Sequence, residues 1–194
     1  MRAYCTFASK QAVFITLFGP RPNKKAFDTV NHSILLSKLY LYGAKGIAYE
    51  LLSSYVENRT QKCAVNGVLS KSCTLTILGP LLLLLYINDL LNCLSNSQPR
   101  MYADDTYLTY ADNDICSLEA SLNQDWLNIN NWLIANKLAL NMTKTEFMLM
   151  GSRQKLKSLS FLPDLEINGT QSNRVDFTKS LGVLIDENLI HSTE

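Results

Sequence analysis

The chain has few of the residues that build metal clusters, disulfide frameworks or membrane spans. Its two histidines, His32 and His191, are too few and too far apart to form a metal cluster. The five cysteines are scattered and show no Cys-x-x-Cys spacing, which argues against a zinc site or disulfides and favours reduced intracellular thiols. The longest apolar run, Leu81–Leu85, soon meets Asn88 and Asp89, well short of the roughly 20 residues that a membrane span needs.

A strong excess of one charge is also missing. The formal net charge is only +1, so composition gives no global signal for nucleic-acid binding, although a local basic path is still compatible with it. The 194 residues are 47% hydrophobic, which predicts a packed core and essentially one domain. No signal for export is evident, and we expect an intracellular protein of the cytoplasm or nucleus.

The most informative sequence feature is Tyr102-Ala103-Asp104-Asp105. These residues lie between two short runs rich in β-formers, which predicts a hairpin with adjacent acids at its tip. Adjacent carboxylates repel each other, and a divalent cation such as Mg²⁺ offsets that repulsion while keeping other coordination sites for water and phosphates. An Asp-Asp pair in a turn is more often only a solvated turn, so the pair does not by itself indicate a metal site.

Further segments accompany this hairpin in a fixed order. They are Lys25–His32 with Ile34–Leu36 and Lys38–Leu39, Ile77–Leu82 with Tyr86–Leu90, Asn136–Leu138 with Asn141, Lys144 and Thr145, and Ser180–Asp186. Together with Tyr102–Asp105, these segments resemble the motifs of reverse transcriptases from non-LTR (LINE- or jockey-like) retrotransposons. The resemblance covers roughly residues 13 to 190, and the ordered set is far more specific than any one segment.

The resemblance implies template-directed DNA synthesis with Mg²⁺ or Mn²⁺, an RNA template and a DNA primer. Asp104 and Asp105 match the paired metal ligands of the third motif, and Lys144 matches a catalytic lysine that assists the departing pyrophosphate. Phe27 matches the aromatic residue beneath the nucleotide sugar. The residues Tyr102, Gly79 and Pro80 are the remaining substrate-binding positions that the resemblance implies. Without it, Phe27 would be interpreted as a core aromatic and Lys144 as a surface charge.

The chain also departs from the family pattern. The first-motif metal-binding Asp is absent in either of two alignments. Counting back from Phe27 without a gap places Pro22 at its position. A better hydrophobic alignment takes Val13-Phe14-Ile15 as the preceding strand and places Thr16 there, with an insertion of about six residues after it. Asp28 matches a second Asp that faces away from the metals. The Gly-Val-Pro-Gln-Gly-Ser loop expected before Ile77 is missing. We also expect the fingers to be missing and the thumb to be truncated or absent. We therefore expect a truncated, degenerate polymerase that is impaired or inactive; the alternatives are a non-catalytic remnant that binds nucleic acid or protein weakly, or a fragment with no selected function.

The predicted fold is α+β, with a palm-like antiparallel sheet and helices packed on one face. Residues 1–150 are predicted to form the partial palm, and residues 151–194 a connector and a primer-grip-like segment. Apolar residues at spacings of three and four from Ile115 to Leu133 predict a core-facing helix. Further predicted elements are helices over 33–42, 47–56 and 79–94, a strand over 145–150 and a polar connector over 152–160. Two hairpins are also predicted, one over 61–74 with Asn66-Gly67 as its two-residue turn and one within 167–185 with Asn168-Gly169 as its turn.

Overall fold

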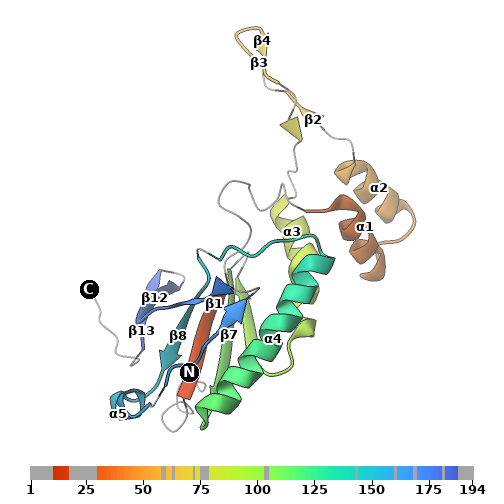
Figure 1. The fold of residues 1–194 in the computed structure, drawn as a ribbon. Helices are drawn as coiled ribbons and strands as arrows, with labels where there is room; N and C mark the ends of the chain where they lie inside the picture. The colour runs from red at the N-terminus through yellow and green to blue at the C-terminus, as the bar shows by residue number, and fades with distance from the viewer. Residues whose placement is uncertain are drawn as a thin grey trace.

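A five-stranded sheet forms the centre of the fold. The computed structural model describes residues 11–17, 30–57, 60–62, 64–71, 73–74, 79–102, 105–142, 144–159, 161–167, 170–180 and 182–187. The strands are β1 (Gln11–Leu17), β6 (Gln98–Tyr102), β7 (Asp105–Asp112), β8 (Glu146–Met150) and β11 (Asn173–Arg174), in the order β11-β8-β1-β7-β6 (Figure 1). Only β11 runs parallel to its neighbour, β8. The predicted α+β class is confirmed.

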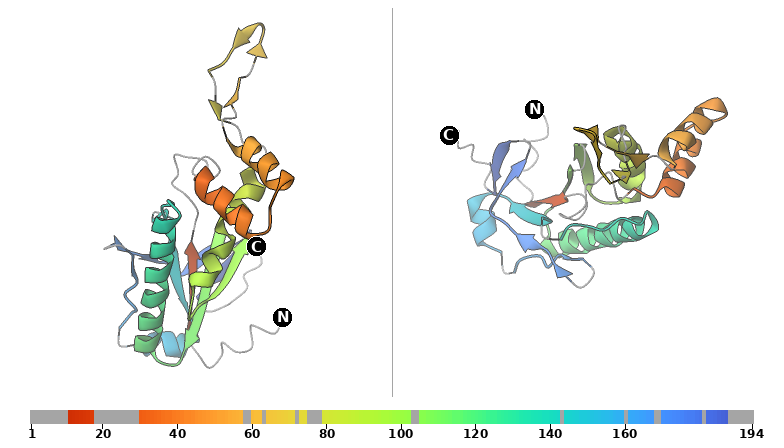
Figure 2. Two further views of the ribbon diagram at one scale, coloured as in Figure 1. Left: turned by 90° about the vertical axis from the view of Figure 1, so that its right-hand side faces the viewer. Right: turned by 90° about the horizontal axis from the view of Figure 1, so that it is seen from above.

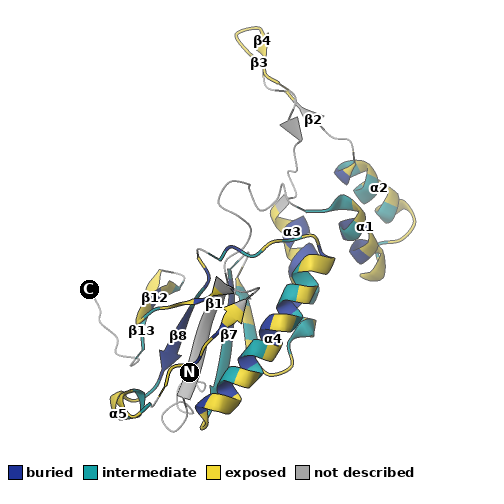
Figure 3. Cartoon of the chain, in the orientation of Figure 1, coloured by how far each residue is buried: buried dark blue, intermediate teal, exposed yellow. Residues whose placement is uncertain are grey.

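The long helix α4 (Ile115–Ala135) covers one face of this sheet. Its buried stripe faces the strands in Figure 3, and it confirms the predicted three- and four-residue periodicity. Asp114 caps the helix by accepting a hydrogen bond from the Ser117 backbone N–H at 2.8 Å. The main core lies between helix and sheet, and its most buried members are Leu108, Leu118, Leu122, Trp126, Ile129, Phe147, Leu149 and Leu165.

A second core joins three further helical segments. These are α1 (His32–Leu41), α2 (Ile47–Val56) and α3 (Gly79–Ile87), which continues into the 3-10 helix η3 (Asn88–Cys93). Their shared buried side chains are Leu35, Leu36, Leu39, Val56, Leu82, Leu83, Tyr86 and Ile87. Figure 2 shows from two more sides that α1 and α2 extend away from the sheet. The predicted helices over 33–42, 47–56 and 79–94 are therefore confirmed.

A slender hairpin follows α2. Its tip consists of β3 (Ala64–Val65) and β4 (Val68–Leu69), and β2 (Thr60–Gln61) pairs with β5 (Cys73–Thr74) at its base. Asn66 and Gly67 connect β3 to β4 with φ values of 51° and 79°. Two positive φ angles are what a type I′ turn requires, so the two-residue hairpin turn predicted from Asn66-Gly67 is confirmed.

The C-terminal part adds one edge strand and two small hairpins. The predicted connector contains a short helix that the sequence analysis missed, α5 (Arg153–Lys157), capped by Ser152. β9 (Glu166–Ile167) pairs with β10 (Thr170–Gln171), and β12 (Phe177–Ser180) pairs with β13 (Val183–Asp186). β11 lies between these two hairpins in sequence and joins the central sheet. None of the helices in the described part of the chain combines the length and apolarity that a membrane crossing needs.

Candidate functional site

The hairpin that carries the paired acids is formed by β6 and β7. Tyr102 pairs with Asp105, and this pair closes a connection of two residues, Ala103 and Asp104. Ala103 and Asp104 themselves lie outside the described residues. The Tyr102 side chain is 63% exposed, whereas Thr106 and Tyr107 are buried directly behind the hairpin tip. The start of β7 is therefore buried just behind the connection, whereas the last residue of β6 is exposed.

Strand β1 lies beside this hairpin in the middle of the sheet. Its register opposes Thr16 to Tyr107 and Leu17 to Thr106 on β7. Directly opposed residues share a face of a sheet, and residues alternate between faces along a strand. Position 16 thus belongs to the same face as Tyr107 and Asp105. Its diagonal separation from Asp105 is about 7–8 Å between Cα atoms, the usual value for such neighbours.

On the other side of β1, strand β8 brings a third acidic residue to this end of the sheet. Glu146 is directly opposite Thr16, and Lys144 is exposed two residues before it. Burial raises the pKa of the Glu146 carboxyl above its ordinary value, because desolvation disfavours the charged form. We call this end of the sheet, with Thr16, Tyr102, Asp105 and Glu146, the hairpin end.

A comparison with protein-family models matches residues 23–183 to a family described as reverse transcriptase (RNA-dependent DNA polymerase). That match spans well over half of the chain. The chain belongs to the reverse transcriptase family. No curated protein matches it. The match begins after β1, so the assignment of Thr16 to the first motif of this reverse transcriptase domain depends on the alignment of the strand and on its register beside β7.

The structure brings some of the predicted site residues of the reverse transcriptase domain together. Asp105 and Tyr102 lie opposite each other at the hairpin end, and Lys144 precedes β8, which begins at the same end of the sheet. Gly79 and Pro80 form the first turn of α3, where a proline is well tolerated because the first helical N–H groups have no intrahelical partner. Asp104 and Phe27 lie outside the described residues, so their placement stays a prediction.

The hairpin end has few side chains that can bind a metal ion among the described residues. In the described part of the chain, no group of three or more His, Cys, Asp or Glu residues is arranged to hold a metal ion. Glu146 is a weak candidate for a missing ligand, since its raised pKa keeps it protonated to a higher pH than an ordinary glutamate. Among the described residues, the hairpin end thus supplies two carboxylates, those of Asp105 and Glu146, and Asp104 lies outside them.

A residue that the sequence analysis missed supports the entry to the hairpin. Asp125 of α4 is 1% exposed, and its carboxylate accepts hydrogen bonds from the backbone N–H groups of Ser95, Asn96 and Ser97 at 2.6–3.2 Å. These three residues lead directly into β6. Through these bonds, Asp125 attaches the start of β6, the strand that ends at Tyr102, to helix α4. The position of Asp125 within the apolar stripe of α4 does not indicate this role, because the N–H groups that it binds are about 30 residues away in sequence.

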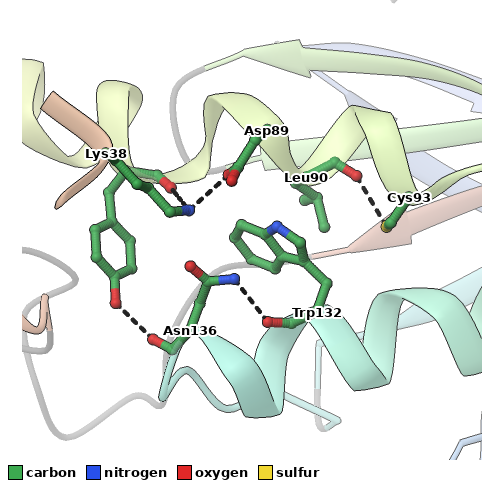
Figure 4. A network of polar contacts seen from close by, with 7 residues as sticks. Lys38, Asp89, Leu90, Cys93, Trp132 and Asn136 are labelled. Atoms are coloured by element: carbon green, nitrogen blue, oxygen red, sulfur yellow. Dashed lines mark hydrogen bonds and ion pairs between the residues drawn. The ribbon is translucent and has the colours of Figure 1, made fainter. Parts of the chain in front are cut away.

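A second polar cluster joins α1, α3 and α4 (Figure 4). The Lys38 ammonium is buried, donates to the Tyr86 carbonyl at 2.7 Å and pairs with the Asp89 carboxylate at 2.6 Å. It also lies 4.8 Å from the ring centroids of both Tyr86 and Trp132. The Tyr86 hydroxyl donates to the Asn136 carbonyl at 2.6 Å, which ties α3 to the end of α4. Lys38 and Asp89 both belong to segments that resemble family motifs, but their pairing was not predicted.

Proposed function

We propose that this chain is the palm part of a non-LTR-type reverse transcriptase whose nucleotidyl-transfer centre is incomplete. The single observation that carries the proposal is the register of β1. Thr16, a neutral residue, pairs with Tyr107, two residues along β7 from Asp105, and the resemblance expects a metal-binding aspartate at the position of Thr16. The fold supports the palm interpretation, because Asp105 pairs with Tyr102 at the start of β7 in an antiparallel hairpin, and α4 packs on one face of the sheet that contains this hairpin.

The chemistry depends strongly on the missing carboxylate. In the family reaction, magnesium or manganese ions stabilise the attacking and leaving oxygens of the phosphoryl group. Asp104 and Asp105 are the residues of this chain that would hold a divalent ion. Lys144 would assist from the residues just before β8. Loss of one charged ligand costs several kcal/mol of transition-state stabilisation, and each roughly 1.4 kcal/mol is about tenfold in rate. We therefore infer that catalysis is impaired.

Primer extension tests this proposal. The purified chain is incubated with an RNA template annealed to a DNA primer, labelled nucleotides, and Mg²⁺ or Mn²⁺. Incorporation is expected to equal that of the Asp104→Asn/Asp105→Asn double variant, because the centre lacks one ligand before either acid is removed. Incorporation clearly above that control, in either metal, would show a working polymerase and overturn the proposed impairment.

The second candidate function is nucleic-acid binding without catalysis. The observation that favours it is the exposure of Tyr102 at the hairpin tip, because exposed aromatic rings stack on bases of every kind. A gel-shift experiment with the same primer–template over a salt series distinguishes the two candidate functions. Binding whose log affinity falls linearly with log salt, together with no extension, supports a nucleic-acid-binding remnant. No binding at any salt concentration would remove both candidates and favour a fragment without selected function.

A further inference from the structure

A basic hollow lies at the opposite end of β8 from the hairpin end. It has a volume of about 440 Å³ and is lined by Arg153, Leu156, Lys157, Arg174 and Glu187. Arg153, Leu156 and Lys157 follow Met150, the end of β8 that lies about 13 Å from Glu146 at the usual rise per residue. Arg174 lines the hollow from β11, where it pairs with Phe147. The hollow therefore belongs to a different part of the surface from the candidate polymerase site, and no family motif accounts for its charges.

Backbone contacts explain how three separate segments meet at this hollow. The Gly151 N–H, just after β8, donates to the Glu187 carbonyl at 3.1 Å. The Glu187 N–H donates to the Asp176 carbonyl at 2.9 Å, and the Val175 N–H donates to the Phe147 carbonyl at 2.9 Å. These bonds hold α5, the end of β11 and the residue after β13 around one opening. The hollow is therefore fixed by main-chain hydrogen bonds, independently of its charged side chains.

The charges that line the hollow are only partly neutralised. The Arg174 guanidinium pairs with the Glu187 carboxylate at 3.0 Å and lies 3.9 Å from Asp176. Arg153 and Lys157 are exposed, and no carboxylate of the described residues forms an ion pair with either. They are four residues apart on α5, hence on one face of the helix and about 6 Å apart along its axis. Two cations without carboxylate partners thus lie beside a third, Arg174, which is paired with Glu187.

We propose that this hollow binds phosphate groups of a nucleic-acid backbone. Arginine offers a planar fork of donors that matches phosphate oxygens, and lysine adds a compact charge beside it. Two cations one helical turn apart suit a repeating polyanion better than a single small anion. The choice of nucleic acid rests on the proposed function, which gives this chain a nucleic-acid partner. The hollow would contact the strand outside the polymerase site and hold it without reading its bases.

The test uses the full chain, a fluorescent single-stranded RNA oligonucleotide and fluorescence anisotropy over a salt series. Arg153→Gln/Lys157→Gln should weaken binding about tenfold at low salt and reduce the salt slope by about 1.4, since each single-strand phosphate contact contributes about 0.7. Glu187→Gln should tighten binding about two- to threefold, because it removes the carboxylate that neutralises Arg174. Lys62→Gln/Lys71→Gln is the matched control, because it removes the same charge from exposed hairpin positions. It should change binding little.

Each other outcome has a definite meaning. Equal losses in the two double variants, or unchanged binding in Arg153→Gln/Lys157→Gln, would overturn the hollow as a site while leaving the proposed function intact. No RNA binding by the unmodified chain would instead count against the proposed function. A further outcome is displacement of the RNA by inorganic phosphate at a concentration equal to that of the RNA phosphate groups. That result would mean that the hollow binds a free anion, and it would overturn the assignment to a nucleic-acid backbone. If the double variant does not fold, Lys157→Gln and Glu187→Gln still give shifts of opposite sign.

Discussion

Replacing Asp89 by asparagine should lower the free energy of unfolding by about 3 kcal/mol, the low end of the cost of removing one partner from a buried ion pair. The low end applies because the Asp89 side chain is 34% exposed, whereas that of its partner Lys38 is only 10% exposed. The substitution leaves the Lys38 ammonium among the Tyr86 and Trp132 rings without a counter-charge. Urea denaturation followed by circular dichroism measures the change.

The pair offers an internal control. Lys38→Met keeps an apolar stem in the same space and leaves only the more exposed carboxylate unpaired, so we expect a loss of about 1–2 kcal/mol. The Lys38→Met/Asp89→Asn double variant should be more stable than Asp89→Asn alone, because it contains no buried charge without a partner. A double variant less stable than either single variant would contradict this account of the Lys38 cluster.

Replacing Asp125 by alanine should destabilise the chain by about 3 kcal/mol. The substitution leaves the backbone N–H groups of residues 95–97 without their acceptor. A hydrogen bond to a charged group contributes a net of about 1.5–3 kcal/mol, and water that reaches the freed N–H groups keeps the total near the cost of one such bond. Amide hydrogen exchange of these three residues should become faster than in the unmodified chain. Since the loop leads into β6, the exposed hairpin tip should also lose order.

Glu119→Gln is the matched control for this prediction. Glu119 lies on the same helix, is partly exposed, and makes no ion pair with the described residues. Its substitution should change the free energy of unfolding by no more than about 0.5 kcal/mol. Equal effects of Asp125→Ala and Glu119→Gln, or unchanged exchange at residues 95–97, would mean that the Asp125 carboxylate does not hold the loop.

Local patterns predicted most of the elements because their causes are local. The stripe from Ile115 to Leu133 shows which face of α4 is buried, and Asn66-Gly67 tolerates the two positive φ angles that its turn requires. The β-formers around Asp105 predict the hairpin for the same reason. Each of these signals is complete within a few residues of sequence.

The contacts that hold the elements around the site could not be predicted from local patterns. Lys38 and Asp89 are 51 residues apart, and their pairing depends on how α1 packs against α3 and η3. Asp125 looks like an ordinary polar residue on a helix until the loop before β6 folds back onto it. The short helix α5 was hidden in a polar connector, where the sequence offers no apolar periodicity to indicate it. In each case the partner is set by tertiary packing, and sequence spacing carries no information about it.

The central claim is that position 16 is the lost metal-ligand position beside the paired acids. Manganese binding to Thr16→Asp, followed by electron paramagnetic resonance, tests it most directly. We expect the substitution to tighten Mn²⁺ binding by about tenfold or more relative to the unmodified chain, which corresponds to about 1.4 kcal/mol. Thr16→Asn, similar in size but uncharged, should bind as weakly as the unmodified chain. The gain should vanish when Asp104 and Asp105 are both replaced by asparagine. Unchanged affinity in Thr16→Asp, or a gain that persists without the paired acids, would contradict the claim.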